Sequence, residues 1–384
     1  MTYLDHNATS PLRPEARAAM ARAMEIGGNP SSVHGAGRVA RSLVEEAREK
    51  VAALVHARAQ DVIFTSGGTE ANALTLWGAV QGALDAETRI TRLFVSAIEH
   101  DSVRANAEAI VERVPGVRLQ TIPVTKTGVV DTEALRVLLR EGKGRSIVAV
   151  MLANNETGAI QPVEQAAKLA KEAGALLLVD AIQAAGKLEI DLAVLGADYL
   201  TLSAHKLGGP QGVGALIVQE SAPFTAQILG GGQERGKRAG TENVVGIAGF
   251  GAAAEASLRG LGSVTRIALL RDRFEHGLKQ IAPDAIVFGE TRLGNTSNFA
   301  LPGIAAETAV IALDLDNVMV SSGAACSSGK VKPSHVLRAM GVSEDLARSA
   351  LRISFGWNST DADADAALVS LHKLVSRNRS RAAA

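Results

Sequence analysis

Short apolar runs alternate with longer segments of mixed polarity between about residues 60 and 220. Within the runs the hydrophobic residues are continuous, as in 146–152 and 175–179, and strands of this kind are covered by helices on both faces. We therefore expect seven strands in a mainly parallel sheet, whose strand order the pattern leaves open. The predicted strands span residues 61–66, 92–97, 118–124, 146–152, 175–180, 199–203 and 213–218.

Helices are predicted between and after these strands. In residues 162–173 the apolar side chains recur every three or four positions, and Gly174 follows as a helix stop signal. An Ala-rich stretch at 243–261 predicts a helix that leads out of a first domain, and residues 262–384 mix helical and strand patterns. We expect a large domain over residues 15–258 and a smaller α/β domain formed by residues 1–14 and 259–384.

Composition favours an α/β fold and limits the partners. The 384-residue chain is 47% hydrophobic but only 3% aromatic, which suits helices and buried parallel strands. Its 40 basic and 40 acidic residues cancel, so neither nucleic acid nor a membrane surface is an expected partner. Since the sequence shows no secretory signal and no uncharged apolar run of ~18 residues, we expect a cytoplasmic protein.

A single cysteine, Cys326, excludes an intramolecular disulfide and any multi-cysteine metal site. None of the eight histidines lies at ligand spacing from another histidine or a cysteine, so no metal site is predicted. A lone cysteine is most often a small buried apolar side chain. The Ser- and Gly-rich surroundings of Cys326 at 321–330 instead indicate an accessible loop.

Polar residues that follow the apolar runs carry the candidate chemistry, because ligands bind at the carboxyl ends of parallel strands. After the first run, small residues that include Gly68 and Thr69 would let backbone N–H groups at a helix start approach a phosphate. Asp180 and Lys206 follow two later runs and are 26 residues apart. Each feature also has an ordinary alternative, namely a plain turn, a helix cap and a solvated lysine.

Together these residues describe a site for pyridoxal phosphate (PLP). Lys206 would hold the cofactor aldehyde as a Schiff base, Asp180 would keep the pyridine nitrogen protonated, and the turn at 68–69 would bind the phosphate. The other expected cofactor contacts are His100 stacked on the ring, Gln183 at the 3-oxygen, and Ser203 and His205 just before the lysine.

Ordered blocks along nearly the whole chain carry a resemblance to a known family. They include YLDHNAT at 3–9 and SAHK at 203–206, and the others lie at 29–34, 64–72, 99–100, 154–156, 179–183, 230–243 and 321–329. With these blocks the chain resembles the PLP-dependent cysteine desulfurases of the NifS/IscS type, which belong to the class V aminotransferases.

The resemblance implies an aspartate-aminotransferase-like fold, PLP fold type I, in a homodimer with active sites near the subunit interface. It implies that Arg352 clamps the carboxylate of the substrate, a task suited to a bidentate guanidinium. Asn155 would contact both a cofactor oxygen and that carboxylate. Thr241 would reach the phosphate of the cofactor in the neighbouring subunit.

The resemblance also implies the role of Cys326. Its thiolate would attack the sulfur of PLP-bound L-cysteine, retain that sulfur as a persulfide and release L-alanine. A thiol with an ordinary pKa near ~8.5 is mostly protonated at pH 7, so a base or cation must assist, and both His100 and Lys330 are candidates. The loop matches family members with an extended cysteine loop.

Such a loop would carry sulfur outward to an acceptor protein. An iron–sulfur scaffold, whose cluster Cys326 would contact transiently, and a carrier for tRNA thiolation are both expected types of acceptor. Two other functions stay open: selenocysteine lyase or another class V PLP aminotransferase, and a protein that mainly docks partners with weak catalysis.

Overall fold

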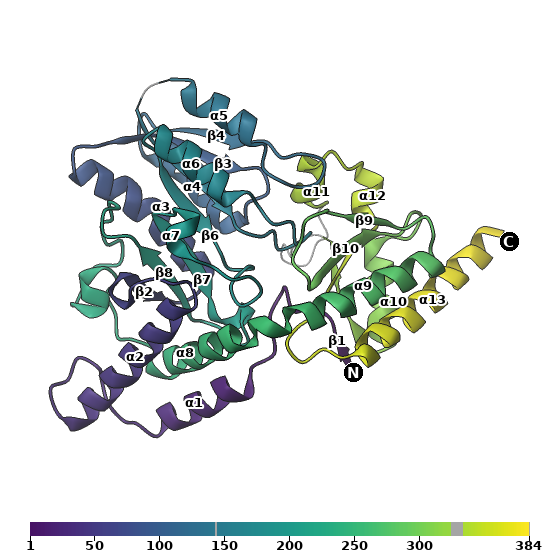
Figure 1. The fold of residues 1–384 in the computed structure, drawn as a ribbon, viewed down its shortest axis with the longest axis horizontal. Coiled ribbons are helices and arrows are strands. Elements are labelled where there is room, and N and C mark those ends of the chain that lie inside the picture. The colour runs from purple at the N-terminus through teal and green to yellow at the C-terminus, as the bar shows by residue number, and fades with distance from the viewer. Residues whose placement is uncertain (143, 324–332, 384) are drawn as a thin grey trace.

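A seven-stranded sheet organises the first two thirds of the chain in the computed structural model, which describes residues 1–142, 144–323 and 333–383 (Figure 1). The strand order is β2-β8-β7-β6-β5-β3-β4. Of the seven strands, β8 alone runs in the opposite direction to the other six, so the predicted mainly parallel sheet is confirmed. Its strands are β2 (Val62–Thr65), β3 (Ile90–Ser96), β4 (Arg118–Ile122), β5 (Arg145–Met151), β6 (Leu176–Asp180), β7 (Tyr199–Ser203) and β8 (Gly214–Val218).

Helices cover both faces of this sheet, which explains the continuous hydrophobicity of its strands. In β5, Ile147 and Ala149 pack into one apolar cluster with α3 (Gly68–Asp85) and α4 (Asp101–Arg113). Val148 and Val150 point to the opposite cluster, since successive side chains of a strand alternate between faces. The helices on that second face are α2 (Gly35–Ala53), α5 (Thr132–Arg140), α6 (Val163–Glu172), α7 (Leu192–Leu195) and α8 (Val244–Arg259).

The two helices predicted from periodicity are present. α6 ends before Gly174, which has the left-handed φ of 65° expected after a helix. α8 begins after the cap Asn243 and ends at Arg259, close to the predicted end at 261, and a 3₁₀ turn at Gly260–Ser263 then joins it to α9 (Val264–Ile281). The joined helix is long and apolar enough to cross a membrane, yet 61% of its most apolar window is buried inside the protein, as in a core helix.

The C-terminal third forms a separate antiparallel sheet in the order β12-β13-β10-β9. Its apolar cluster joins Phe274 and Phe299 to Leu4, and β1 (Thr2–Tyr3) pairs with β11 (Val318–Met319), so the N-terminus belongs to this layer. The sheet consists of β9 (Ile286–Phe288), β10 (Thr296–Ala300), β12 (Ser321–Ser322) and β13 (Ala350–Ser354), and the helices here are α9, α10 (Ala306–Leu315), α11 (His335–Ala339), α12 (Glu344–Arg348) and α13 (Asp361–Ala383).

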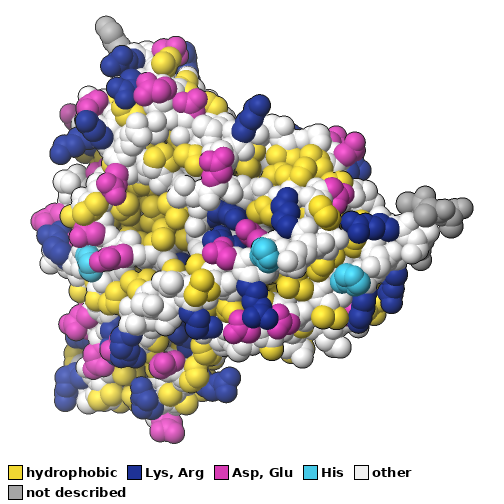
Figure 2. Space-filling view, turned by 45° about the vertical axis from the view of Figure 1, so that its right-hand side comes forward, with side chains coloured by type: hydrophobic (Ala, Val, Ile, Leu, Met, Phe, Trp, Pro, Cys, Tyr) yellow, Lys and Arg dark blue, Asp and Glu magenta, His cyan; other side chains and the backbone are white. Residues whose placement is uncertain are grey.

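The chain crosses between the two sheets near its N-terminus. From β1 it runs back to α1 (Pro14–Met24), which lies along α8 (Figure 1). The crossing segment passes the carboxyl ends of the strands in the large sheet, where Ser10 N–H donates to the His205 carbonyl. On the face shown in Figure 2, basic and acidic side chains are interspersed without a large area of one sign.

Candidate active site

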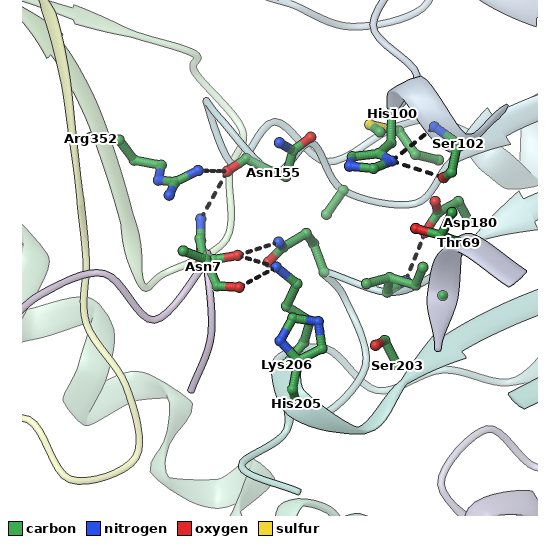
Figure 3. Close-up of a pocket in the computed structure, with 16 residues that line it drawn as sticks. Asn7, Thr69, His100, Ser102, Asn155, Asp180, Ser203, His205, Lys206 and Arg352 are labelled. Carbon is green, nitrogen blue, oxygen red and sulfur yellow. Dashed lines mark hydrogen bonds between the residues drawn. The ribbon is translucent and has the colours of Figure 1, made fainter. Parts of the chain in front are cut away.

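A cavity of about 300 Å³ lies where the carboxyl ends of β3, β5, β6 and β7 face the crossing segment and β13 (Figure 3). Ten of the predicted site residues line it: Gly68, Thr69, His100, Asn155, Asp180, Gln183, Ser203, His205, Lys206 and Arg352. Six further residues share the lining: Asn7, Ala8, Ser102, Met151, Ala153 and Ile182. The strand ends that carried the sequence argument therefore meet at one place.

Asp180 ends β6 and is only 5% exposed. Its two carboxylate oxygens accept hydrogen bonds from Asn72 Nδ2 at 2.9 Å and from the Ile182 backbone N–H at 3.0 Å. Burial raises the pKa of Asp180, while these two bonds and the positive charges of His100 and Lys206 act against the rise. A buried carboxylate of this kind is matched by a cationic donor such as a protonated ring nitrogen.

Lys206 lies in the short 3₁₀ turn that follows β7. Its Nζ donates to the backbone carbonyls of Asn7 and Ala8, at 2.6 and 2.7 Å. The crossing segment thus holds the amine at the cavity wall. The neighbouring His205 contacts Thr9 Oγ1 through Nδ1 at 3.2 Å, and burial lowers its pKa to about 4, with Lys206 adding to the effect.

Gln183 has its side-chain amide fixed in one orientation. Lys187 Nζ donates to Gln183 Oε1 at 3.0 Å and to its backbone carbonyl at 2.9 Å, while Gln183 Nε2 donates to the Asn7 carbonyl at 2.8 Å. Because a backbone carbonyl only accepts hydrogen bonds, the amide must keep its NH₂ on the Asn7 side. Gln183 therefore presents a donor at the cavity wall, as an oxygen of a ligand would require.

A glycine-dependent helix start faces the cavity from another side. α3 begins at Gly68 after Gly67, whose φ of 139° favours glycine. A Cβ on Gly68 would lie 2.2 Å from Ile182 Cδ1, so a larger residue at position 68 would require the Ile182 side chain to shift. Among the described residues no side chain caps the start of this 18-residue helix, and uncapped N–H groups at a helix start suit a phosphate.

His100 caps the start of α4 and lines the cavity. Its Nδ1 accepts a hydrogen bond from the Ser102 backbone N–H at 3.1 Å and lies 2.8 Å from Ser102 Oγ. The ring is thereby held at the cavity wall (Figure 3).

Arg352 enters the cavity from β13 and is 3% exposed. Its Nη2 donates to Asp5 Oδ1 at 2.7 Å and its Nη1 to the Asn155 carbonyl at 2.9 Å. Among the described residues, none bonds the buried Arg352 Nε. A guanidinium with a spare N–H in a polar cavity suits a carboxylate ligand.

Two predicted residues are not in this group. Thr241 is exposed and does not line the cavity of the single chain. Cys326 and Lys330 lie outside the described residues. The chain on either side of 324–332 is anchored beside the site: Ser321 pairs with Arg352 in the sheet, and His335 Nε2 lies 3.1 Å from the Glu99 carbonyl.

Several site residues were not predicted from the sequence. Asn7 and Ala8 lie about 200 positions before the lysine that they bind, and no local pattern indicates that contact. Ser102 follows His100 by two positions, and this spacing is the one local signal available, since a serine there can bond a capping histidine. Lys187 follows Gly186 in a turn, where most lysines are solvated.

The residues present fit PLP. Its ring nitrogen needs a buried acid, its phosphate a helix start free of side chains, its aldehyde an amine and its 3-oxygen a donor. Asp180, the glycines that open α3, Lys206 and Gln183 supply these four groups around one cavity.

Comparisons with known proteins agree with this site. The family model for aminotransferase class-V matches residues 2–367. A cysteine desulfurase of Cereibacter sphaeroides is 45% identical over 98% of this chain and 96% of its own length. An IscS-like cysteine desulfurase of Mycobacterium tuberculosis is 39% identical over 100% of this chain and 98% of its own.

A solved structure, the NifS-like protein from Rickettsia africae, superposes with a TM-score of 0.88 at 34% identity, covering 98% of this chain and 99% of that one. The proteins of this family depend on PLP, so the cofactor is PLP. The chain belongs to the class-V aminotransferase family and, within it, to the cysteine desulfurases.

Proposed function

We propose that this chain removes the sulfur of L-cysteine, leaving L-alanine and a persulfide on Cys326. The observation that carries the proposal is a single cavity with a buried carboxylate, Asp180, on one side and a buried guanidinium, Arg352, on the other (Figure 3). Lys206 projects into the same cavity from below these two groups in that view. The first group suits a cofactor ring and the second suits the carboxylate of an amino acid.

PLP, when bound, supplies an electron sink that weakens the bonds around the α-carbon of an amino acid. Asp180 would hold the ring nitrogen in its protonated form, and Gly68 and Thr69 would bind the phosphate. Lys206 would hold the aldehyde carbon and, once released, would move protons beside the substrate. The remaining proposed cofactor contacts are His100 at the ring face, Gln183 at the 3-oxygen, and Asn155, Ser203 and His205.

Substrate binding would engage Arg352 and Asn155. In the structure Asp5 already occupies one N–H of the guanidinium, at 2.7 Å. An incoming carboxylate would take its place or use the spare Nε of Arg352. Because the guanidinium is almost fully buried, its bond to a carboxylate would be poorly screened by water.

Sulfur transfer would use Cys326. The thiolate sulfur of Cys326 would bond to the substrate sulfur as the carbon–sulfur bond of the substrate breaks, and the bonding electrons would pass to the substrate carbon, which is then protonated to give L-alanine. This placement is supported by the anchors of the surrounding chain: Ser321 is paired with Arg352, and Ser334 Oγ donates to Glu156.

A homodimer would complete the site. Thr241 is exposed in the single chain, and a second subunit would bring this residue to the phosphate of its neighbour's cofactor. Within each subunit we propose a large PLP-binding domain at 15–258 and a small domain of 1–14 and 259–384. The apolar cluster that unites Leu4 with Phe274 and Phe355 supports this division.

We further propose a cytoplasmic enzyme that hands its sulfur to an acceptor protein, such as an iron–sulfur scaffold. The lone cysteine supports this, because a persulfide on Cys326 has no second thiol in the same chain to resolve it.

The test is conversion of L-cysteine to L-alanine and sulfide by the purified holoenzyme with a thiol reductant. Cys326→Ala should keep the absorbance of the bound cofactor but lose sulfide release, and Lys206→Ala should lose the borohydride-reducible link to PLP. Sulfide release by the first variant at the original rate would contradict the persulfide mechanism. Preferential turnover of L-selenocysteine would instead favour a selenocysteine lyase.

A further inference from the structure

Asn72 lies directly behind the active site. It belongs to α3, is 0% exposed and does not line the cavity. It lies between two residues that do, Asp180 and Ser102, and bonds to both. A fully buried amide must satisfy all its donors and acceptors, so its partners define its orientation.

The hydrogen bonds of Asn72 permit one orientation only. Thr201 Oγ1 donates to Asn72 Oδ1 at 2.7 Å. The NH₂ group then faces the other way, and its two hydrogens go to Asp180 Oδ2 and to Ser102 Oγ, each at 2.9 Å. A flipped amide would set its oxygen against the Asp180 carboxylate, so the observed orientation is strongly preferred.

The orientation of the Asn72 amide also determines the direction of the hydrogen bond between Ser102 and His100. Ser102 Oγ already accepts a hydrogen from Asn72, and its own hydrogen is free to point at His100 Nδ1, 2.8 Å away. The Ser102 backbone N–H, which can only donate, points at the same Nδ1 from 3.1 Å. An imidazole nitrogen that receives two hydrogen bonds carries a lone pair and no proton.

His100 therefore carries its proton on Nε2 when it is neutral. Figure 3 shows Nδ1 turned toward Ser102 and the second ring nitrogen on the opposite side of the ring. A neutral His100 then offers the cavity a hydrogen-bond donor and no acceptor. In this state it cannot take the proton of the Cys326 thiol, which leaves that step to another group.

We propose that Asn72 is a positioning residue of the active site, which holds Asp180 with one N–H and, with the other, orients the Ser102 hydroxyl so that it adds a second hydrogen bond to the Nδ1 of His100 beside that of the Ser102 backbone N–H. The inference rests on the proposed function for the role of these two residues toward PLP. The tautomer itself can be read without any substrate.

The experiment measures the ring nitrogens of His100 by ¹H–¹⁵N NMR in holoenzyme labelled with ¹⁵N-histidine. A His100→Gln spectrum identifies the signal among the eight histidines. At a pH where His100 is neutral, we expect a protonated Nε2 and an unprotonated Nδ1. A neutral His100 protonated at Nδ1 would overturn the proposal, whatever the variants do.

Asn72→Asp tests both hydrogen bonds that the Asn72 NH₂ group donates, one to Asp180 and one to Ser102. The new carboxylate would repel Asp180 and would draw the Ser102 hydroxyl hydrogen away from His100. We expect the dissociation constant of PLP to rise by roughly tenfold or more, and the ¹⁵N chemical shift of His100 Nδ1 to change because this nitrogen loses the Ser102 hydroxyl bond while it keeps the bond from the Ser102 backbone N–H. An unchanged dissociation constant and an unchanged ¹⁵N chemical shift of His100 Nδ1 in this variant would contradict the inference.

Thr75→Ala is the matched control. Thr75 is on the same helix and 1% exposed, and within the described part of the chain its hydroxyl bonds only to the Ala71 carbonyl of that helix. In Thr75→Ala we expect the PLP dissociation constant and the NMR signal of His100 to stay as in the unmodified enzyme. Equal changes in Thr75→Ala and Asn72→Asp would mean that Asn72 contributes only to packing, which would contradict the inference. An enzyme with the expected tautomer but no sulfide release would refute the proposed function and leave this inference standing.

Discussion

Glu234→Gln is expected to lower the free energy of unfolding substantially, although Glu234 lies in a short 3₁₀ turn, Gln233–Gly236. Glu234 is 6% exposed and accepts three hydrogen bonds, from Arg48 Nη1 at 2.6 Å, Arg48 Nη2 at 3.1 Å and the Phe64 backbone N–H at 2.9 Å. It also starts a left-handed run, with φ of 47° at Glu234 and 57° at Arg235. The buried ion pair thus holds a strained turn against β2.

The magnitude follows from burial of the remaining charge. Arg48 is 3% exposed, and a glutamine offers one acceptor oxygen where the carboxylate offered two, so an NH₂ group would face a donor. Breaking one partner of a buried pair costs about 3–5 kcal/mol when the remaining charge is left unpaired. Arg48 would keep the half-exposed Glu45 at 3.2 Å from its Nε, so we expect a loss of about 3 kcal/mol. With an unfolding entropy of ~2.1 cal/mol/K per residue, about 0.8 kcal/mol/K for this chain, the melting temperature should fall by about 4 °C.

The assay is thermal unfolding of the holoenzyme followed by circular dichroism. Glu344→Gln is the matched control, since it removes the same charge from a pair with Arg348 in which both side chains are 64% exposed. We expect no measurable shift for that control. The double variant Arg48→Met/Glu234→Leu removes both charges and should recover much of the lost stability.

Equal melting temperatures for Glu234→Gln and Glu344→Gln would refute the reasoning, because a buried and an exposed pair would then contribute alike. A double variant less stable than Glu234→Gln would also contradict it.

Three further predictions concern the site and its surroundings. Arg352→Gln should lower kcat/KM for L-cysteine by roughly 10- to 100-fold, mainly through KM, and an unchanged KM in steady-state kinetics would exclude it as the carboxylate ligand. Lys187→Met should free the Gln183 amide and raise the PLP dissociation constant by roughly tenfold; equal affinity in an absorbance titration would contradict this positioning role. Burial lowers the pKa of His6 to about 4 from 6.5. Between pH 6.5 and 4, His6 is therefore protonated in the unfolded chain but neutral in the folded chain. The neutral His6 contributes stability that is fully present above pH 6.5 and is lost as the pH falls toward 4. The melting-temperature gap between the unmodified protein and His6→Gln should narrow over that range, and a constant gap would contradict the assignment.

The strands were predictable because burial on both faces leaves a local signature. Every predicted strand of the large sheet is present, and Ile147 and Val148 show why: neighbouring residues of one strand pack into opposite apolar clusters. Strand order and the reversed direction of β8 were not predictable, since β8 pairs with β2, about 150 positions earlier in the chain. The helix α8, Val244–Arg259, matches the predicted helix at 243–261, while the 3₁₀ turn at Gly260–Ser263 that joins it to α9 was not predicted.

The candidate site was predictable to the extent that it lies at strand ends. Asp180 and Lys206 could be found from their positions after apolar runs, because parallel strands bring such residues to one edge. Asn7 and Asn72 each bond to a site residue more than 100 positions away in the chain: Asn7 bonds to Lys206, and Asn72 bonds to Asp180. Their roles depend on tertiary hydrogen bonds, for which the sequence offers no local period or motif.

The central claim is that Cys326 receives the sulfur of L-cysteine. The most direct measurement is a single turnover of the holoenzyme with one equivalent of L-cysteine and no reductant, followed by intact-mass and peptide mass spectrometry. We predict one equivalent of L-alanine and a chain heavier by one sulfur atom, with the added mass on the peptide that contains Cys326. Formation of L-alanine while the mass of that peptide is unchanged would contradict the account.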